Sequence, residues 1–307
     1  MKVLFGVDGS AGSLEAVRQV SRLISADSDQ LAMYYSPPTV HVDSAAATDP
    51  DLLARVRTAL TDEIFREAEQ VLPTEFRGSV HQMVGTQDPK RGLLLAADEW
   101  RADLIVVGAR GLGPVRQLLL GSVSNTIVRA AKVPVFVARR RDDAHSAQGL
   151  RILMAWDGSK MNPQAKELLF QFTWPTETVG AVITVMEPWL GPSAAAWLHR
   201  HPEQHAEASV VQVWMQQWEA EKQARLDSLS QYGSALPVPF QHGERLLAEG
   251  NATDEILKAI AAQQTDLLIM GARTMGPAER LLAGSTSEQI MAHAPCSVLV
   301  IRQHEVP

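Results

Sequence analysis

The sequence predicts an α/β protein of two tandem domains, each built on a doubly wound sheet of five parallel strands. Three observations predict this class. The chain repeats itself, short apolar strands alternate with helical patterns in each copy, and a length of 307 residues suits two domains of about 150 residues.

The repeat is visible in two pairs of segments. Residues 2–10 read KVLFGVDGS and residues 151–159 read RILMAWDGS, an offset of 149. Residues 104–139 align without a gap with residues 267–302 at an offset of 163, and 16 of the 36 positions are identical. The second copy therefore carries 163 − 149 = 14 additional residues in its middle.

The boundary between the copies is expected in the polar stretch DDAHSAQG, which has the composition of a linker. The first domain then spans 1–141, the linker 142–149 and the second domain 150–307. The second domain contains an enlarged helical segment, 187–232, with four tryptophans and a long helix from about 203. We expect this segment to pack against the other domain or another subunit.

Each element of the first copy has its own signal. The strand at 2–7 is almost wholly apolar, as buried parallel strands are, and apolar residues recur at helical spacing over 13–25. A strand at 30–36 ends at two prolines, and Asp49 with Pro50 begins a helix that runs to about Val71. The same criteria then predict a strand at 77–84, a helix at 90–101, a strand at 103–108, a helix at 122–132 and a strand at 134–139.

In the second copy, strands are expected near 151–156, 179–186, 237–243, 266–271 and 297–302. Strict alternation of strands and helices implies a parallel sheet covered on both faces. Ligands of such sheets bind outside the carboxyl ends of the strands, where the strand order reverses. Asp8 and the glycines after residue 107 both fall at such strand ends.

The most informative motif is Gly108-Ala109-Arg110-Gly111, followed after nine residues by Gly121-Ser122. Gly111 and Gly113 permit positive φ and leave the backbone open to a ligand. Gly121-Ser122 opens a helix, whose free N–H groups and dipole favour a phosphate. Ser124 adds a hydroxyl donor, and Asp8 offers a carboxylate to a ribose hydroxyl or to a hydrated Mg²⁺.

This spacing is similar to the ATP-binding motif of the universal stress proteins, and Asp-Gly-Ser after the first strand also resembles that family. The resemblance covers nearly the whole chain apart from 187–232. It implies a fold like that of the adenine nucleotide alpha hydrolases, which is Rossmann-like. It also implies ATP, AMP or ADP as ligand, with Mg²⁺ near Asp8. Carried over position by position, it implies a site in the first domain formed by Asp8, Ser10, Tyr35, Val107, Gly108, Arg110, Gly111, Gly121, Ser122, Val123 and Ser124.

The second copy departs further from the motif. Thr274 replaces the second glycine, and a β-branched residue resists positive φ. Trp156 replaces Val7 beside the aspartate, where it is expected to fill the pocket. Its weaker candidate site consists of Asp157, Gly271, Arg273, Gly284, Ser285 and Ser287.

The expected function is that of an adenine-nucleotide-binding regulatory protein of the stress response, with at most weak ATP hydrolysis. No catalytic residue is identified. One alternative is a nucleotide-free scaffold, which Tyr35, Trp156 and Thr274 would favour. Another is an enzyme of a related fold, but the sequence contains neither its His-x-Gly-His nor its Ser-Gly-Gly-x-Asp-Ser signature, and no Walker A loop.

Bulk properties limit the partners. A net charge of −7 disfavours nucleic acid as a binding partner. No stretch approaches the ~20 apolar residues of a membrane span, so we expect a cytoplasmic protein. A single cysteine excludes an intrachain disulfide, and no metal site is expected from His199, His201 and His205. The resemblance implies that strands 134–139 and 297–302 pair within the chain as a pseudo-dimer. It also implies that two chains form a homodimer.

Overall fold

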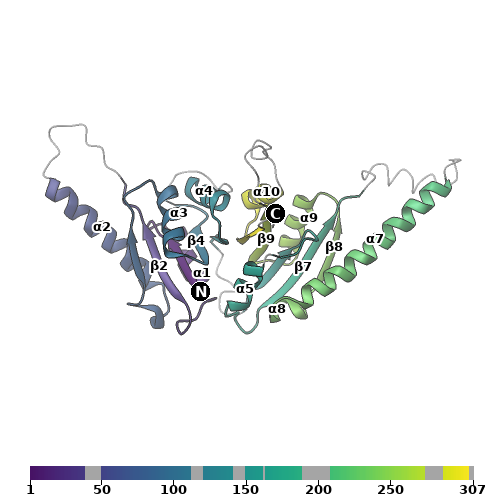
Figure 1. Ribbon diagram of the computed structural model, residues 1–307, viewed down its shortest axis with the longest axis horizontal. Coiled ribbons are helices and arrows are strands. Elements are labelled where there is room, and N and C mark those ends of the chain that lie inside the picture. The colour runs from purple at the N-terminus through teal and green to yellow at the C-terminus, as the bar shows by residue number, and fades with distance from the viewer. Residues whose placement is uncertain are drawn as a thin grey trace.

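The computed structural model describes residues 1–38, 50–111, 120–140, 149–161, 163–188, 208–273 and 286–303. Its strands form a single sheet of ten, in the order β3-β2-β1-β4-β5-β10-β9-β6-β7-β8. Each half contributes five parallel strands, and the two halves lie side by side with their long helices α2 and α7 on opposite flanks (Figure 1). The predicted fold class and the predicted repeat are confirmed.

The first half contains five strands and four α-helices within the described residues. In chain order they are β1 (Lys2–Gly6), α1 (Ala11–Val20), β2 (Gln30–Tyr35), α2 (Pro50–Gln70), β3 (His81–Val84), α3 (Pro89–Trp100), β4 (Leu104–Gly108), α4 (Ser122–Ala130) and β5 (Val135–Ala138). Strand β1 pairs with β2 on one side and β4 on the other, so the strand order reverses between β1 and β4. This reversal places a ligand crevice at the carboxyl ends of β1 and β4.

The second half repeats this topology, with β6 and β9 at its own reversal point. Its described elements are β6 (Arg151–Ala155), α5 (Pro163–Gln171), β7 (Val179–Met186), α7 (Ala208–Ser234), α8 (Val238–Gln241), β8 (Arg245–Glu249), α9 (Ala252–Ala262), β9 (Leu267–Arg273), α10 (Thr286–His293) and β10 (Ser297–Gln303).

One predicted strand is wrong. The segment 237–243 is not a strand: it contains the short helix α8, and the third strand of this half is β8, which follows it and lies at the edge of the sheet. The ring of Phe240 is fully buried, edge-on to Trp174 at 6.4 Å, and it packs against Gly180. Pro239 has no N–H to donate to a neighbouring strand, which disfavours a strand here, and the segment forms a short helix instead.

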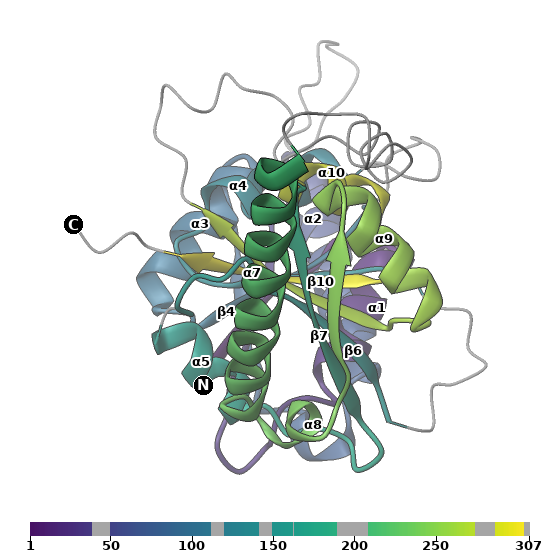
Figure 2. The same ribbon diagram turned by 90° about the vertical axis from the view of Figure 1, so that its right-hand side faces the viewer.

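Two apolar layers, one on each face of the sheet, extend through both halves. One face packs against α1, α2, α5, α7 and α8, and the other packs against α3, α4, α9 and α10. Figure 2 shows α7 lying across the strands of the second half on the first of these faces. Buried residues from both halves belong to each layer, so the chain has continuous cores rather than two separate ones.

The halves join at β5 and β10, the only antiparallel pair among the described strands. Phe136 lies opposite Leu299, with Val135 and Val137 paired to Val300 and Val298. Pairing of these last strands within one chain is therefore confirmed, and the chain forms an internal pseudo-dimer.

Polar contacts reinforce this junction. Ser297 of β10 is fully buried, and its hydroxyl donates to Oε1 of Gln19 on α1 at 2.6 Å. Arg139 donates to the backbone carbonyls of Met291 and Cys296 in the second half. Burial lowers the pKa of the Arg139 guanidinium, and Arg110 acts in the same direction, against an opposing influence of Cys296. The first helix of one half is thus bonded directly to the last strand of the other.

The enlarged segment does not pack against the first half where the structure describes it. Trp218 of α7 donates to Glu249 of β8, in its own half, and Trp214 is 44% exposed. Trp189, Trp197, His199, His201 and His205 lie outside the described residues. None of the described helices combines the length and the apolar character needed to cross a bilayer.

Candidate functional site

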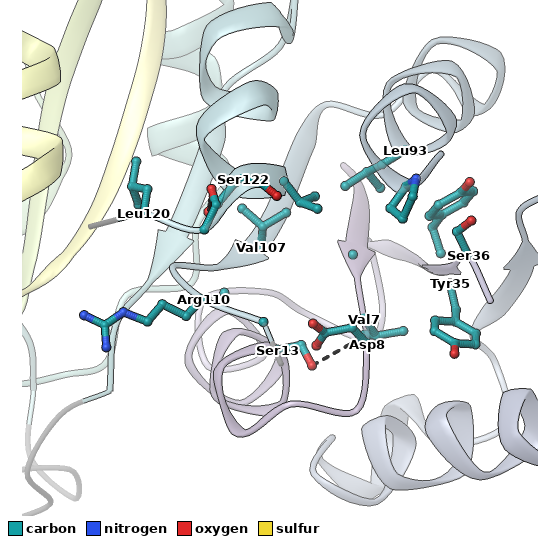
Figure 3. A pocket seen from close by; sticks show the side chains of 18 residues that line it. Val7, Asp8, Ser13, Tyr35, Ser36, Leu93, Val107, Arg110, Leu120 and Ser122 are labelled. Carbon is teal, nitrogen blue, oxygen red and sulfur yellow. Dashed lines mark hydrogen bonds between the residues drawn. The ribbon is translucent and has the colours of Figure 1, made fainter. Parts of the chain in front are cut away.

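A cavity of about 410 Å³ lies at the carboxyl ends of β1 and β4. Its walls come from the ends of β1, β2 and β4, from the segment 120–124 and from the start of α3. Figure 3 shows Asp8 and Val7 on one side and Val107 and Ser122 on the other. The volume is within the range of about 300–1,000 Å³ that is typical of small-molecule pockets.

The loop after β1 fixes Asp8. Its Oδ1 accepts from the backbone N–H of Ser10 at 3.0 Å and from the Ser10 hydroxyl at 2.6 Å. Gly9 adopts φ +75°, which glycine tolerates, and the N–H of Asp8 donates to the Ser13 hydroxyl (Figure 3). Because Oδ1 is engaged by the loop, Oδ2 is the oxygen best placed to meet a ligand.

The first turn of α4 forms the opposite wall. Gly121 is its N-cap residue and provides no side-chain hydrogen bond, whereas Ser10 caps α1 and Asp88 caps α3 with their side chains. Ser122 is exposed, and Gly121 to Ser124 all line the cavity. Within the described residues, the backbone donors at the start of α4 therefore lie at the cavity without a capping side chain from the N-cap position.

Glycine is required at two positions for steric reasons. A Cβ on Gly108 would lie 2.6 Å from the carbonyl carbon of Gly12, and a Cβ on Gly111 would lie 2.3 Å from Oδ2 of Asp8. The positive φ that glycine permits is not used at Gly111: among the described glycines, positive φ occurs at Gly9, Gly78, Gly158 and Gly250, and Gly113 lies outside the described residues. The glycines at 108 and 111 are explained instead by how closely the backbone passes Gly12 and Asp8.

The other end of the cavity is apolar and aromatic. Leu93 and Pro89 of α3 line it together with Tyr34 and Tyr35 of β2. The Tyr35 ring is buried edge-on to Phe65 of α2 at 6.4 Å. Burial raises the pKa of Tyr35, and Asp8 acts in the same direction, so the phenol stays neutral at physiological pH.

Ten of the eleven residues predicted for the first site line this one cavity. The exception is Ser10, which is 7% exposed and caps α1 behind Asp8, so its role is to hold the carboxylate. Arg110 lines the cavity, but its guanidinium points away from Asp8 (Figure 3). The ten that line it are Asp8, Tyr35, Val107, Gly108, Arg110, Gly111, Gly121, Ser122, Val123 and Ser124.

Sequence reasoning missed the wall that α3 contributes. The signal for it was present, because Asp88 followed by Pro89 is a typical helix start directly after the third strand. Because the strands of a parallel sheet end at the same edge, that start lies at the same edge of the sheet as Asp8. The additional lining residues are Gly6, Val7, Ser13, Tyr34, Ser36, Pro89, Leu93 and Leu120.

Replacing Tyr34 with phenylalanine is expected to raise the free energy of unfolding by about 1 kcal/mol. The Tyr34 hydroxyl is buried and wedged between Gly85 and Gly92. Ser36 is near enough to lower the pKa of Tyr34, but the Ser36 hydroxyl donates to the carbonyl of Gln87, and no hydrogen bond of good geometry reaches the Tyr34 hydroxyl among the described residues. Removing an unpaired buried hydroxyl removes its desolvation cost and leaves the ring packing intact. Urea unfolding checks this, and a loss of 1 kcal/mol or more would show that the hydroxyl is paired.

The second half keeps the aspartate loop. Asp157 Oδ1 accepts from the backbone N–H of Ser159 at 3.0 Å and from its hydroxyl at 2.5 Å, and Gly158 adopts φ +90°. The surroundings differ, however. Trp156 stacks on Tyr232 of α7 with ring centroids 4.6 Å apart, and the Arg225 guanidinium lies against Gly158.

The loop after β9 differs as well. In the first half the pairing with β5 ends at Gly108, and the chain turns so that Gly121 N–H donates to Ala109 O at 2.8 Å. In the second half β9 continues to Arg273, which pairs with Gln303. Arg273 therefore extends the strand where the first half has begun its turn. Of the other predicted residues, Ser287 lies in α10, Gly271 lies in β9, and Thr274, Gly284 and Ser285 lie outside the described residues.

Metal-binding clusters are absent from the described part of the chain: no three His, Cys, Asp or Glu side chains gather closely enough. Any cation at Asp8 would therefore need ligands from a bound molecule or water.

The family model described as "Universal stress protein family" matches the chain twice, over residues 1–139 and 150–302. A universal stress protein of Mycolicibacterium smegmatis is 24% identical over 304 residues, which cover 98% of this chain and 96% of that relative. A shorter one of Mycobacterium tuberculosis is 32% identical over 136 residues, or 44% of this chain and 93% of the relative.

Solved structures show the same fold over the whole length. The crystal structure of a universal stress protein from Archaeoglobus fulgidus superimposes with a TM-score of 0.60 at 19% identity, and the match covers 99% of this chain and 98% of that one. The tandem arrangement of two such domains is thus shared with a protein of known structure.

Proposed function

Because the chain belongs to the universal stress protein family over both halves, we propose that its first half binds one adenine nucleotide, with ATP as the leading candidate. The chain would act as a nucleotide-dependent regulatory protein of the stress response rather than as an enzyme. The observation that carries the proposal is the start of α4, whose N-cap residue Gly121 has no side chain to cap it and which faces Asp8 across a cavity of about 410 Å³.

The two ends of the cavity suit the two ends of a nucleotide. Helix N-termini favour phosphate, and the segment from Gly121 to Ser124 lines the cavity with backbone and hydroxyl donors. Asp8, held by Ser10, would accept from a ribose hydroxyl. Apolar side chains at Val7, Val107 and Leu93 would cover the base.

Mg²⁺ fits this arrangement only as a companion of the phosphates. Asp8 is the one carboxylate among the residues that line the cavity, and Mg²⁺ commonly uses one or two carboxylates together with phosphate oxygens and water. The ion would neutralise phosphate charge there. Arg110, whose guanidinium points away, would have to turn to reach the terminal phosphate (Figure 3).

The second half is proposed to bind no nucleotide. Trp156 occupies the position of Val7 and is stacked on Tyr232, and burial with Asp157 nearby raises the pKa of that tyrosine, which keeps it neutral. Arg273 extends β9 where the first half turns toward its phosphate loop. One nucleotide per chain is the expected stoichiometry.

The experiment is to measure released and added nucleotide. Freshly purified protein is denatured, its nucleotide is quantified by chromatography and mass spectrometry, and Mg-ATP, ADP and AMP are titrated by calorimetry. We expect one site per chain and no steady release of phosphate. Two sites would contradict closure of the second half. Absence of nucleotide with no binding at millimolar Mg-ATP would leave the scaffold alternative.

A further inference from the structure

The two halves meet across an approximate two-fold axis that the repeat itself defines. At the repeat offset of 163, Phe136 corresponds to Leu299, and these two residues lie directly opposite each other in the β5–β10 pair. The valines at 135 and 137 correspond to those at 298 and 300 and pair in the same symmetric way. Two β5 strands from different chains, or two β10 strands, could therefore pair in the same register. The backbone and the valines of the junction do not decide which halves join.

One buried hydrogen bond at the junction is not symmetric. The Ser297 hydroxyl donates to Oε1 of Gln19 at 2.6 Å, and Ser297 is fully buried. The first-half residue that corresponds to Ser297 is Pro134, which has no hydroxyl. At the offset of 149, the counterpart of Gln19 is Leu168, and both Leu168 and the adjacent Leu169 are buried and apolar. This hydrogen bond therefore forms only where a first half meets a second half.

Pairing of like halves would separate both partners of that bond. In a β5–β5 junction, Oε1 of Gln19 would face Pro134 of the other copy. In a β10–β10 junction, the Ser297 hydroxyl would face Leu168. The carbonyl oxygen of Arg139 is also within its reach in this structure, but at 3.4 Å, which is too long for a strong bond. A buried polar group that loses its partner keeps its full desolvation cost, so both like pairings are disfavoured.

An ion pair on the other face of the sheet has the same asymmetry. Helices α4 and α10 lie on either side of the junction (Figure 1), and Arg129 of α4 lies 3.2 Å from Glu288 of α10. At the offset of 163 their counterparts are Ala292 and Asn125, which carry no charge. Both charged side chains are exposed, so the pair contributes little. It nevertheless favours the same choice of partner as the buried hydrogen bond.

We propose that Gln19 and Ser297 make the two halves of the chain recognise each other and exclude pairing of like halves between chains. The excluded form is an exchanged dimer, joined through one β5–β5 and one β10–β10 junction, which is a form of domain swapping. It would keep the strand pairing but lose two of these hydrogen bonds. Specificity of this kind comes from the cost of the wrong partner. It should therefore persist when the connection between the halves is cut.

The test cuts that connection in the folded, full-length protein. A recognition sequence for a site-specific protease is inserted into 142–149, and cleaved protein is mixed with isotopically labelled cleaved protein in mild urea until the labels have mixed. Native mass spectrometry then counts the pairs, because the two halves differ in mass. We expect at least about nine-tenths of the wild-type pairs to join unlike halves, which corresponds to an exchange constant about 100-fold below the statistical value.

Two variants separate the hydrogen bond from the shape of the junction. Gln19→Leu/Ser297→Ala removes both partners, so unlike pairs should fall toward the statistical share of about one half. Phe136→Leu is the matched control: it makes the central apolar contact the same in every pairing but keeps the hydrogen bond, so it should pair as the wild type does. A wild type with a statistical mixture would overturn the proposal. So would a double variant that pairs like the wild type, or mixing caused by Phe136→Leu alone. None of these outcomes bears on nucleotide binding.

Discussion

Replacement of Ser122 by glutamate is expected to weaken adenine-nucleotide binding by about 100-fold or more while leaving the chain folded. Ser122 is the first residue of α4, is exposed and lines the cavity. A carboxylate there would compete for the N–H groups of the first turn and repel a phosphate. At about 4 Å, two unit charges repel by about 4 kcal/mol at an effective dielectric constant of 20.

The same substitution should not destabilise the protein. Glutamate in a first helical turn interacts favourably with the helix dipole, by about 0.3–1 kcal/mol. A lower affinity combined with an equal or higher melting temperature separates this effect from unfolding. Asn125→Glu is the matched control, because Asn125 is exposed on the same helix and does not line the cavity. Equal affinities of the two variants would exclude the start of α4 as the phosphate site.

Gly108→Ala is expected to lower the free energy of unfolding by about 3 kcal/mol and to abolish nucleotide binding. The added Cβ would lie 2.6, 2.7 and 2.9 Å from the carbonyl carbon and oxygen of Gly12 and the nitrogen of Ser13. All three are backbone atoms at the start of α1, so no side-chain rotation can relieve the contact. The helix itself must move away from β4, and it carries Ser13 in the cavity wall.

The matched control for this substitution lies in the same site. A Cβ on Gly121 would meet its nearest atom at 3.5 Å, an ordinary van der Waals distance, so Gly121→Ala should cost less than about 1 kcal/mol. Urea unfolding of both variants, followed by calorimetry with Mg-ATP, gives the two readouts. Equal stabilities would mean that α1 and β4 are not packed as closely as the structure has them.

The second half shows what happens without this contact. Its counterpart of Gly12 is Met161, and α5 begins at Pro163, two residues beyond that position, whereas α1 begins at Ala11. A Cβ on Gly12 would lie 2.4 Å from the carbonyl oxygen of Arg110, so the close packing at Gly12 leaves no room for a methionine. Helix α5 therefore begins later along the chain than α1 does. In the same half, the stack of Trp156 on Tyr232 occupies space beside the aspartate loop.

Alternation of apolar strands and amphipathic helices was sufficient to predict the topology, because buried parallel strands and sheet-covering helices have distinct periods. It failed at 237–243, where Val238 and Phe240 suggest a strand but Val238 is 73% exposed. The real edge strand, β8, is only partly buried, and its sequence RLLAE has an apolar run of only three residues between two charged ones. Edge strands with one neighbour carry a weaker signal than central ones.

The spacing of the glycines, and its recurrence in both copies, predicted where the cavity lies. Glycines are needed there because the backbone comes close to a neighbouring segment. The spacing and the repeat could not assign Ser10, whose hydroxyl caps α1, or the direction of Arg110, whose guanidinium points away from Asp8 (Figure 3). The departures at Trp156 and Thr274 pointed to an altered second site. The extension of β9 to Arg273 was not visible, because it depends on pairing with β10.

The antiparallel pairing of β5 with β10 has a consequence for how the two copies could diverge. Residues 139–150 connect β5 to β6 within one chain, so the contact between β5 and β10 is intramolecular and its effective concentration does not fall on dilution. Neither copy then has to preserve a surface for recognising a free partner. Mutations that close one crevice leave assembly unharmed, so a duplicated gene can retain a ligand in one copy and use the other as a permanent structural companion.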